Sequence, residues 1–312
     1  MKRKIVVIPD IHFGLQPSYV QFDYPKHILD VVKKIISDNS DATFILTGDI
    51  FHNAGVKSYY SLEEHQILRD LQDKGQLIVV KGNGKHCYDI YKQSPTFESV
   101  YGIECGIREI GALKIGLIGY FSKQEELDSA VDRIMSQSVD IIVTHNFLSG
   151  GFGKAVFPEA DIPVIAGHDH STSINTKTER NCIGSVACTD FGSASTSGGN
   201  VYAAIKDGEI KFYSTNCIKF ETWEWTPELN LKSLAENDSV NRVILPNDDP
   251  ALFKQVSEYA DVVQVTTSEE ATAADIDISV ENLDFKAQWE EYATNEPKPV
   301  IELGKEALDE AE

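Results

Sequence analysis

Five short apolar runs in this chain end in Asp, Asn or His, residue types that can bind metal ions, and this pattern constrains the fold more than any other feature. Each run has the length and the apolar character of a buried strand. The motifs that follow them are PDIH (9–12), TGDIFH (47–52), KGNG (81–84), VTHN (143–146) and AGHDH (166–170). Because sites gather at the carboxyl ends of strands in α/β sheets, the pattern predicts that these residues form one site.

Predicted helices alternate with predicted strands through the first 220 residues. Apolar residues recur at helical spacing in Lys26–Ser37, Ser58–Asp73 and Lys123–Ser136, and Ser61 and Glu64 have the spacing of a capping box. Strands are expected at residues 5–8, 42–46, 76–80, 114–118, 140–143, 163–166, 182–186, 201–205 and 210–215. We therefore expect an α/β fold, in which a two-sheet sandwich is flanked by helices.

Three segments are expected along the chain. The domain that carries the site spans residues 1–222. A small β-α-β module is expected within residues 223–270, where VNRVILP, DPALFKQVSEYA and DVVQVTTS have the patterns of a strand, a helix and a strand. Residues 271–312 combine an acidic linker of small residues with a helical C-terminal tail, LDFKAQWEEYA and IELGKEALDEAE.

The negative charge of the chain is concentrated in its last third. Residues 221–312 carry 23 acidic and 6 basic side chains, whereas residues 1–220 carry 26 and 22. Charge of this sign repels phosphate, so binding to nucleic acid would need local attraction from metal ions or from a partner subunit. The acidic segment suits a protein-binding role or a solvated linker and tail, and both interpretations stay open.

Cysteine usage and hydropathy bear on the cellular compartment. The five cysteines, at positions 87, 105, 182, 188 and 217, include no Cys-x-x-Cys pair. Their odd number favours reduced thiols in the cytoplasm over a disulfide scaffold or a zinc ribbon. No apolar run approaches the roughly 18 residues of a membrane span. Ile5–Ile8 is too short for a signal-peptide core and ends near Asp10, so it is expected to be the first strand.

The side chains of the five motifs can form a dinuclear metal site, in which Asp49 bridges two ions. One ion would take Asp10, His12 and His170, and the other would take Asn83, His145 and His168. Mixed imidazole and oxygen ligands suit Mn, Fe or Zn better than Mg or Ca. Two such ions, roughly 3.5–4 Å apart, can clamp a phosphate and generate a hydroxide for in-line attack.

This set of motifs resembles that of the calcineurin-like metallophosphoesterases. Within that superfamily the chain is most similar to the SbcD-type DNA repair nucleases, which have phage and bacterial members. GDIFH places His52 three residues after Asp49, where this branch often has His or Asp. CIGSVACTDFG is similar to the I-G-S/T segment that follows the last histidine motif of the family. The resemblance is specific in residues 1–195 and loose after residue 230.

The resemblance implies a sandwich with a dimetal site at one edge and Mn²⁺-dependent exonuclease and endonuclease cleavage of DNA, in repair and recombination. It implies that the β-α-β module is a capping domain that faces DNA. It further implies that the C-terminal tail binds an SbcC-like coiled-coil ATPase, and that the protein forms a homodimer in the cytoplasm.

The sequence departs from the family at one motif. Where the family has G-N-H-D or G-N-H-E, this chain has GNGK, so Asn83 is retained but Gly84 replaces the histidine that helps to protonate the leaving oxygen. His86 can take that role from a rearranged loop. Lys85 can supply positive charge, but an ammonium with a pKa near 10.4 is a poor proton donor at neutral pH. Loss of a general acid typically costs about 10²–10⁴-fold in rate.

Three hypotheses follow. The first is a two-metal DNA nuclease in which His52 and His86 are the catalytic residues. The second is a catalytically weakened accessory subunit that binds DNA ends in the same complex. The third is a small-molecule phosphodiesterase, against which the β-α-β module and the tail argue. His27 and His65 lie inside predicted helices and are expected to be ordinary packing or surface residues.

Overall fold

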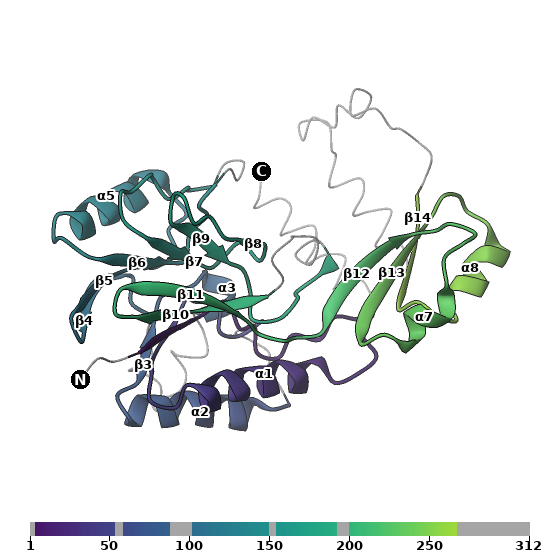
Figure 1. Cartoon of the computed structure of the whole chain (residues 1–312), viewed down its shortest axis with the longest axis horizontal. Coiled ribbons are helices and arrows are strands. Elements are labelled where there is room, and N and C mark those ends of the chain that lie inside the picture. Colours follow the sequence, from purple (N-terminus) through teal and green to yellow (C-terminus); the bar gives the residue numbers. More distant parts are fainter. Residues whose placement is uncertain (1–3, 54–58, 88–101, 150–153, 192–199, 267–312) are drawn as a thin grey trace, which may run out of the picture. The chain divides into compact units, whose positions relative to one another are not determined.

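The computed structural model describes residues 4–53, 59–87, 102–149, 154–191 and 200–266 (Figure 1). By its internal contacts the chain divides into two units, Met1–Thr266 and Thr267–Glu312. Every described element belongs to the first unit. The predicted linker and partner-binding tail, residues 271–312, lies outside the described residues.

The first sheet has five strands and mixes parallel and antiparallel pairs, in the order β11-β10-β1-β2-β3. Its strands are β1 (Ile5–Ile8), β2 (Thr43–Leu46), β3 (Leu77–Val79), β10 (Val201–Lys206) and β11 (Glu209–Ser214). The central strand β1 pairs parallel with β2 and antiparallel with β10. The first three strands therefore end at the same edge, and their following loops carry the first three motifs.

The second sheet has six strands in the order β4-β5-β6-β7-β9-β8. They are β4 (Cys105–Ile110), β5 (Leu113–Ile118), β6 (Ile141–Thr144), β7 (Val164–Ala166), β8 (Thr172–Ser173) and β9 (Arg180–Ile183). The pairs β5–β6, β6–β7 and β7–β9 are parallel. The carboxyl ends of β6 and β7 therefore present the last two motifs at one edge of this sheet.

The two sheets pack face to face because β1 is apolar on both sides. Ile5 and Val7 pack in the cluster that joins the two sheets, where they meet residues of the second sheet such as Leu117. Val6 and Ile8 point the other way and belong to the cluster beneath α1. This alternation follows from the two-residue period of a strand.

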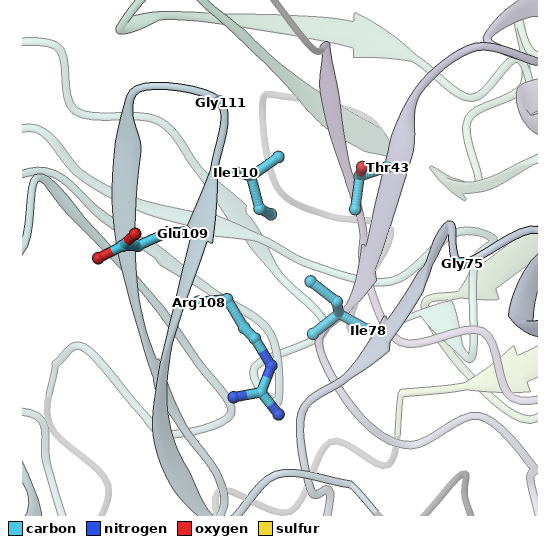
Figure 2. Close-up of a pocket in the computed structure, with 7 residues that line it drawn as sticks. All are labelled: Thr43, Gly75, Ile78, Arg108, Glu109, Ile110 and Gly111. Atoms are coloured by element: carbon cyan, nitrogen blue, oxygen red, sulfur yellow. The ribbon is translucent and has the colours of Figure 1, made fainter.

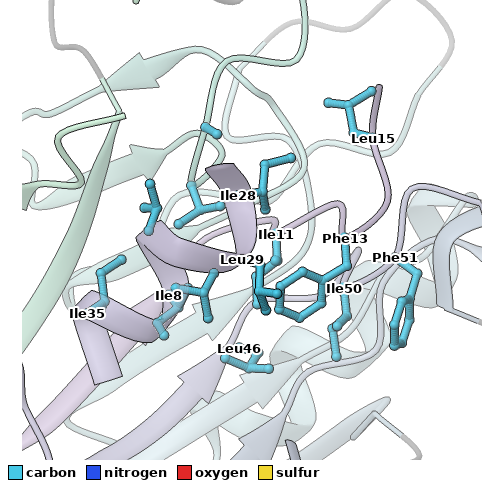
Figure 3. Packing of buried hydrophobic residues seen from close by; sticks show 14 of the residues in the cluster. Ile8, Ile11, Phe13, Leu15, Ile28, Leu29, Ile35, Leu46, Ile50 and Phe51 are labelled. Carbon is cyan, nitrogen blue, oxygen red and sulfur yellow. The ribbon is translucent and has the colours of Figure 1, made fainter. Parts of the chain in front are cut away.

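Helices cover the outer faces of both sheets (Figure 1). They are α1 (Tyr24–Asp38) and α2 (Ser61–Asp73) on the first sheet, and α5 (Gln124–Met135) on the second. Figure 3 shows the packing of α1, with Ile28 and Leu29 set against Ile8 and Leu46. Leu127, Val131 and other apolar residues of α5 form a third cluster with the second sheet. The predicted two-sheet sandwich flanked by helices is confirmed.

A smaller three-stranded parallel sheet follows the sandwich, in the order β12-β13-β14. Its elements are β12 (Lys219–Glu224), α7 (Leu231–Glu236), β13 (Ser239–Leu245), α8 (Pro250–Val256) and β14 (Val262–Val265). The sequence pattern anticipates the β13-α8-β14 unit but misses β12 and α7. The predicted domain boundary between residues 222 and 223 falls inside β12. Phe220 and Val240 of this module belong to the same apolar cluster as Ile28 of α1.

Some local predictions differ from the structure. Ser61 is the first residue of α2, the preceding Tyr60 makes no side-chain cap, and Glu64 is fully buried, so the predicted capping box is wrong. The strand predicted at residues 182–186 ends at Ile183 instead, because Gly184 takes a φ of +70° that an extended strand cannot hold.

The two histidines of α1 and α2 make the packing contacts expected of them. The Nε2 atom of His27 accepts a hydrogen bond of 3.0 Å from the backbone N–H of Ile218, just before β12. The His65 ring stacks on Phe51, with 5.2 Å between ring centroids. Within the described part of the chain, no helix combines the length and the apolar character that crossing a membrane requires.

Candidate metal centre

The structure brings the seven predicted ligands together at the carboxyl ends of five strands. Two groups have ligand atoms within 4.8 Å of one another, and Asp49 belongs to both. The groups are Asp10, His12, Asp49 and His170, and Asp49, His145 and His168. The seventh residue, Asn83, donates from its side-chain Nδ2 to Asp49 Oδ2 at 2.9 Å. Apart from Asn83, the members of the two groups are those of the two ligand sets predicted from the sequence, and Asp49 lies within reach of both.

Hydrogen bonds hold the two central carboxylates in position. Thr47 Oγ1 donates to Asp10 Oδ1 at 2.7 Å, and the backbone N–H of His168 donates to Asp10 Oδ2 at 2.7 Å. The backbone N–H of Asn83 donates to Asp49 Oδ1 at 2.9 Å. Each donor comes from another loop of the site, so each hydrogen bond also fixes the relative positions of two loops.

Three of the seven residues have left-handed backbone conformations that are unusual for residues other than glycine. The φ angles are 52° at His12, 42° at Asp49 and 74° at His168. Such conformations cost free energy and persist only where the surroundings enforce them, and they cluster at functional sites. Here each follows the end of a strand and turns the chain so that its side chain can face the site.

Glycines allow the loops to approach closely. Gly48 has a φ of +124°, and a Cβ atom there would lie 2.7 Å from both Gly82 Cα and His145 Nδ1. At Gly167 a Cβ atom would overlap Asp10 Oδ1 and Thr47 Oγ1. These glycines are needed because the backbone itself lines the site.

Replacing Gly167 by alanine is expected to displace the Asp10 carboxylate. The added methyl has no room beside Asp10 Oδ1, so we expect metal affinity to fall about 10–100-fold, as when a residue that orients a ligand is lost. Overpacking should also destabilise the protein by roughly 1–3 kcal/mol. Calorimetric titration with Mn²⁺ and thermal unfolding measure the two effects.

The matched control is Gly84→Ala, because nothing lies within 4 Å of a Cβ atom at Gly84. Gly84→Ala should bind metal as the unaltered protein does. Equal Mn²⁺ affinities for the Gly167 variant and this control would contradict the expected displacement of the Asp10 carboxylate.

The buried charged groups of the site shift one another's pKa values. Asp10, Asp49 and His145 are almost wholly inaccessible to solvent. His145 Nδ1 lies 3.5 Å from Asp10 Oδ1, and His145 Nε2 lies 3.2 Å from Asp49 Oδ1. Burial alone would lower the pKa of His145, yet the two carboxylates raise this pKa to about 10. In return His145 holds the pKa values of both carboxyl groups below their usual range, against the effect of burial.

Two further imidazoles of the site, those of His12 and His168, are held neutral at neutral pH. Burial, followed by the neighbouring His170, lowers the pKa of His12 to about 3. Burial, followed by His145, lowers the pKa of His168 to about 4. A neutral imidazole offers a lone pair to a metal ion, so these rings are in the form that coordination requires.

The donor atoms of the site fit divalent cations. Among the described residues, His12 Nδ1 and both nitrogens of His168 are buried ring nitrogens without a hydrogen-bond partner, whereas the two nitrogens of His145 face the Asp10 and Asp49 carboxylates. His12 Nε2 and His170 Nε2 also face each other at 2.9 Å. Buried polar atoms are normally satisfied, so imidazoles left unsatisfied beside ionised carboxylates indicate a place for cations. The mixed nitrogen and oxygen set suits Mn, Fe or Zn.

Two further histidines, His52 and His86, lie beside His12 at the more accessible side of the site. Ring centroids are 5.7 Å apart for His12 and His52, and 4.9 Å apart for His12 and His86. The three rings form a further group with ligand atoms within 4.8 Å. His86 lies in the short helix α3 (Gly84–Cys87), and its Nδ1 contacts the backbone carbonyl oxygen of His52. The GNGK motif has no histidine at position 84, but the loop that follows it brings His86 close to His12.

A pocket of about 320 Å³ lies elsewhere, where β2 and β3 begin (Figure 2). Its lining includes Thr43, Ile78 and the side chain of Arg108 from β4. The predicted ligands follow the opposite, carboxyl ends of β2 and β3. This pocket is therefore separate from the metal-binding groups.

Comparison with known proteins agrees with the fold and with the motifs. Residues 3–172 match the calcineurin-like phosphoesterase family. No curated protein matches the chain. One similar solved structure is a predicted phosphoesterase of Streptococcus pneumoniae TIGR4, 15% identical, covering 73% of this chain and 95% of that chain with a TM-score of 0.36.

Two more solved structures resemble the chain to a comparable degree. An archaeal phosphodiesterase is 15% identical, and the match covers 67% of this chain and 98% of that chain with a TM-score of 0.38. YfkN, a calcineurin-like phosphoesterase from Bacillus subtilis, is 14% identical, with coverages of 68% and 90% and a TM-score of 0.37. Because the family match spans more than half of the 312 residues, the chain belongs to the calcineurin-like phosphoesterases, a family of metal-dependent phosphoester hydrolases.

Proposed function

We propose that this protein is the nuclease subunit of an SbcCD-like DNA repair and recombination complex, and that it hydrolyses DNA phosphodiester bonds with two divalent ions, Mn²⁺ in the cell. The observation that carries the hydrolytic part is the position of Asp49, which belongs to two ligand groups at once. Two divalent ions, when bound, would supply Lewis-acid activation of the phosphate and an acidified water.

The chain's own residues would orient the substrate and move protons. His52 and His86 flank His12 on the accessible side, where a phosphate above the two ligand groups would lie. The contact from His86 Nδ1 to the carbonyl oxygen of His52 fixes its ring, so that Nε2 is the atom left to face the substrate. His86 would protonate the leaving sugar oxygen, and His52 would hold a phosphate oxygen.

A cation close to a segment that is attached to the metal centre supports a polymeric substrate. Ser185, from the I-G-S segment, pairs with Asp10, and Val186 N–H donates to the Asp10 carbonyl oxygen at 2.9 Å. This segment leads to Phe191, whose ring lies 4.7 Å from the guanidinium of Arg242 on β13. The β12-β13-β14 module thus brings a cation towards the same segment, and a DNA backbone needs such local positive charge in an acidic protein.

The partners in this proposal are DNA, a second copy of the chain and an SbcC-like coiled-coil ATPase that binds the C-terminal tail. The tail carries the apolar residues Leu283, Phe285, Trp289 and Tyr292 in a strongly acidic segment, a composition that suits protein rather than DNA contact. The described cysteines are free thiols, in keeping with a cytoplasmic setting.

A second candidate is an accessory subunit that binds metal and DNA ends but cuts slowly. The observation that favours it is the GNGK motif, in which Gly84 stands where the family has its proton-donating histidine. Gly84 lies at the exposed start of α3, and its missing Cβ would meet nothing within 4 Å. A histidine can therefore be introduced at this position without steric conflict.

A cleavage assay on linear duplex DNA in Mn²⁺ distinguishes the two candidates. It compares the unaltered protein with the variant Gly84→His/Lys85→Asp, each with and without the ATPase partner. The nuclease proposal predicts that the unaltered protein already cuts and gains less than about tenfold from the change, because His86 supplies the proton. Cutting by the altered protein alone would favour the accessory role. Hydrolysis of small phosphodiesters without action on DNA would exclude both.

A further inference from the structure

Two cysteines outside the metal centre share one hydrogen-bond acceptor. Cys188 Sγ lies 3.0 Å from Asn200 Oδ1, and Cys217 Sγ lies 3.1 Å from the same oxygen. Each thiol also shifts the pKa of the other, Cys217 downwards and Cys188 upwards. Both are free, with Cys188 buried and Cys217 partly exposed. Two sulfur atoms held against one oxygen atom are neighbours in space, although they are far apart in the sequence.

Asn200 holds this arrangement in a fixed orientation. Its Nδ2 donates to the carbonyl oxygen of Ser185 at 2.9 Å, so the amide oxygen must face the thiols. Its backbone carbonyl oxygen accepts from the N–H of Thr215 at 3.0 Å, which places the segment of Cys217 beside it. The pairing is thus built by backbone and side-chain hydrogen bonds on both sides.

We propose that Cys188 and Cys217 form a reversible disulfide when the protein meets a peroxide. The Cys217 sulfur would attack the peroxide, breaking the O–O bond and forming a sulfenic acid, with water or an alcohol as the leaving product. The Cys188 sulfur would then attack the Cys217 sulfur. The S–S bond forms, the S–O bond breaks, and the hydroxyl leaves as water with the proton of Cys188.

The environment assigns the two roles. The neighbouring thiol of Cys188 lowers the pKa of Cys217 to about 7, whereas the neighbouring thiol of Cys217, together with burial, raises the pKa of Cys188. The thiolate is the nucleophile in such reactions, and Cys217 is the more exposed of the two. Cys217 is therefore the attacking residue and Cys188 the resolving one.

The disulfide would link the segment that enters the small β12-β13-β14 module to a segment beside the metal centre. Cys217 lies in the connection between β11 and β12, which leads into the small module. Cys188 precedes Thr189, whose Oγ1 lies 2.8 Å from Nδ1 of the metal-centre residue His170. A disulfide here would fasten the entry of the module to the loop that supports His170. The proposal does not depend on the substrate of the enzyme.

Peroxide treatment of the full-length protein, followed by alkylation and peptide mapping without reduction, tests the disulfide. We expect a linked peptide pair that contains Cys188 and Cys217, returns to free thiols with dithiothreitol, and raises the melting temperature by about 5–10 °C through loop closure. Cys188→Ser and Cys217→Ser should each abolish both the link and the shift.

Cys182→Ser is the matched control, because Cys182 is close in sequence to Cys188 but its Sγ contacts the carbonyl oxygen of Asp169 instead. The link should persist in this variant. A link that vanishes in the Cys182 variant, or oxidation of Cys217 to sulfinic acid without any linked pair, would overturn the proposal.

Discussion

Replacing Asp49 by asparagine is expected to lower metal-dependent phosphodiester hydrolysis by about 10³-fold or more. Asp49 belongs to both ligand groups, so the change removes a shared negative charge rather than one ligand of one ion. Several kcal/mol of transition-state stabilisation depend on such ions, and each 1.36 kcal/mol is tenfold in rate. Calorimetric titration with Mn²⁺ should show that binding of both ions is weakened together.

The control for this variant is Asp169→Asn, which makes the same change in charge between His168 and His170. The Asp169 carboxylate accepts from the backbone N–H of Ser171 at 3.0 Å, a role that an asparagine oxygen can also fill. Asp169→Asn should retain metal binding and activity. Two ions bound at normal affinity in the Asp49 variant would refute the shared role.

Replacing His86 by alanine is expected to lower DNA cleavage by about 10²–10⁴-fold while both metal ions remain bound. His86 has its ring 4.9 Å from that of His12 but belongs to neither of the two groups that share Asp49. Loss of its proton-donating group should therefore reduce turnover without reducing metal affinity. Adding Gly84→His and Lys85→Asp to this variant should restore cleavage.

His27→Ala is a suitable control, because His27 is also a partly buried histidine but lies in α1 and bonds to Ile218. It should leave the cleavage rate unchanged. If His86→Ala cleaves DNA at the normal rate, His86 is an ordinary loop residue and the proton must come from elsewhere.

The strand ends were predictable from the sequence because they depend on local patterns. Short apolar runs bounded by Gly and by polar residues identify β1, β2, β6 and β7 with little error at their ends. Since parallel strands end at one edge, the sequence alone predicts that the motifs form one group.

Other features depend on contacts that no local pattern reveals. The domain boundary predicted between residues 222 and 223 cuts through β12, whose sequence KFETWE was not predicted to be a strand. Its strand form comes from parallel pairing with β13. β4 was missed for a similar reason, since CGIREI gains its strand form from the hairpin with β5. His86 comes close to His12 because the chain turns at α3, a helix of four residues that is too short to show a hydrophobic periodicity in the sequence.

The metal centre draws its residues from loops that are far apart along the chain, and this has a consequence for folding. His12 and His170 meet through their Nε2 atoms although 158 positions separate them, and they come from different sheets. The site therefore cannot form until both sheets have folded and packed on each other. Metal ions should bind the native protein and not its partly folded forms. The delay before Mn²⁺ binding during refolding therefore measures how long the two sheets take to pack on each other.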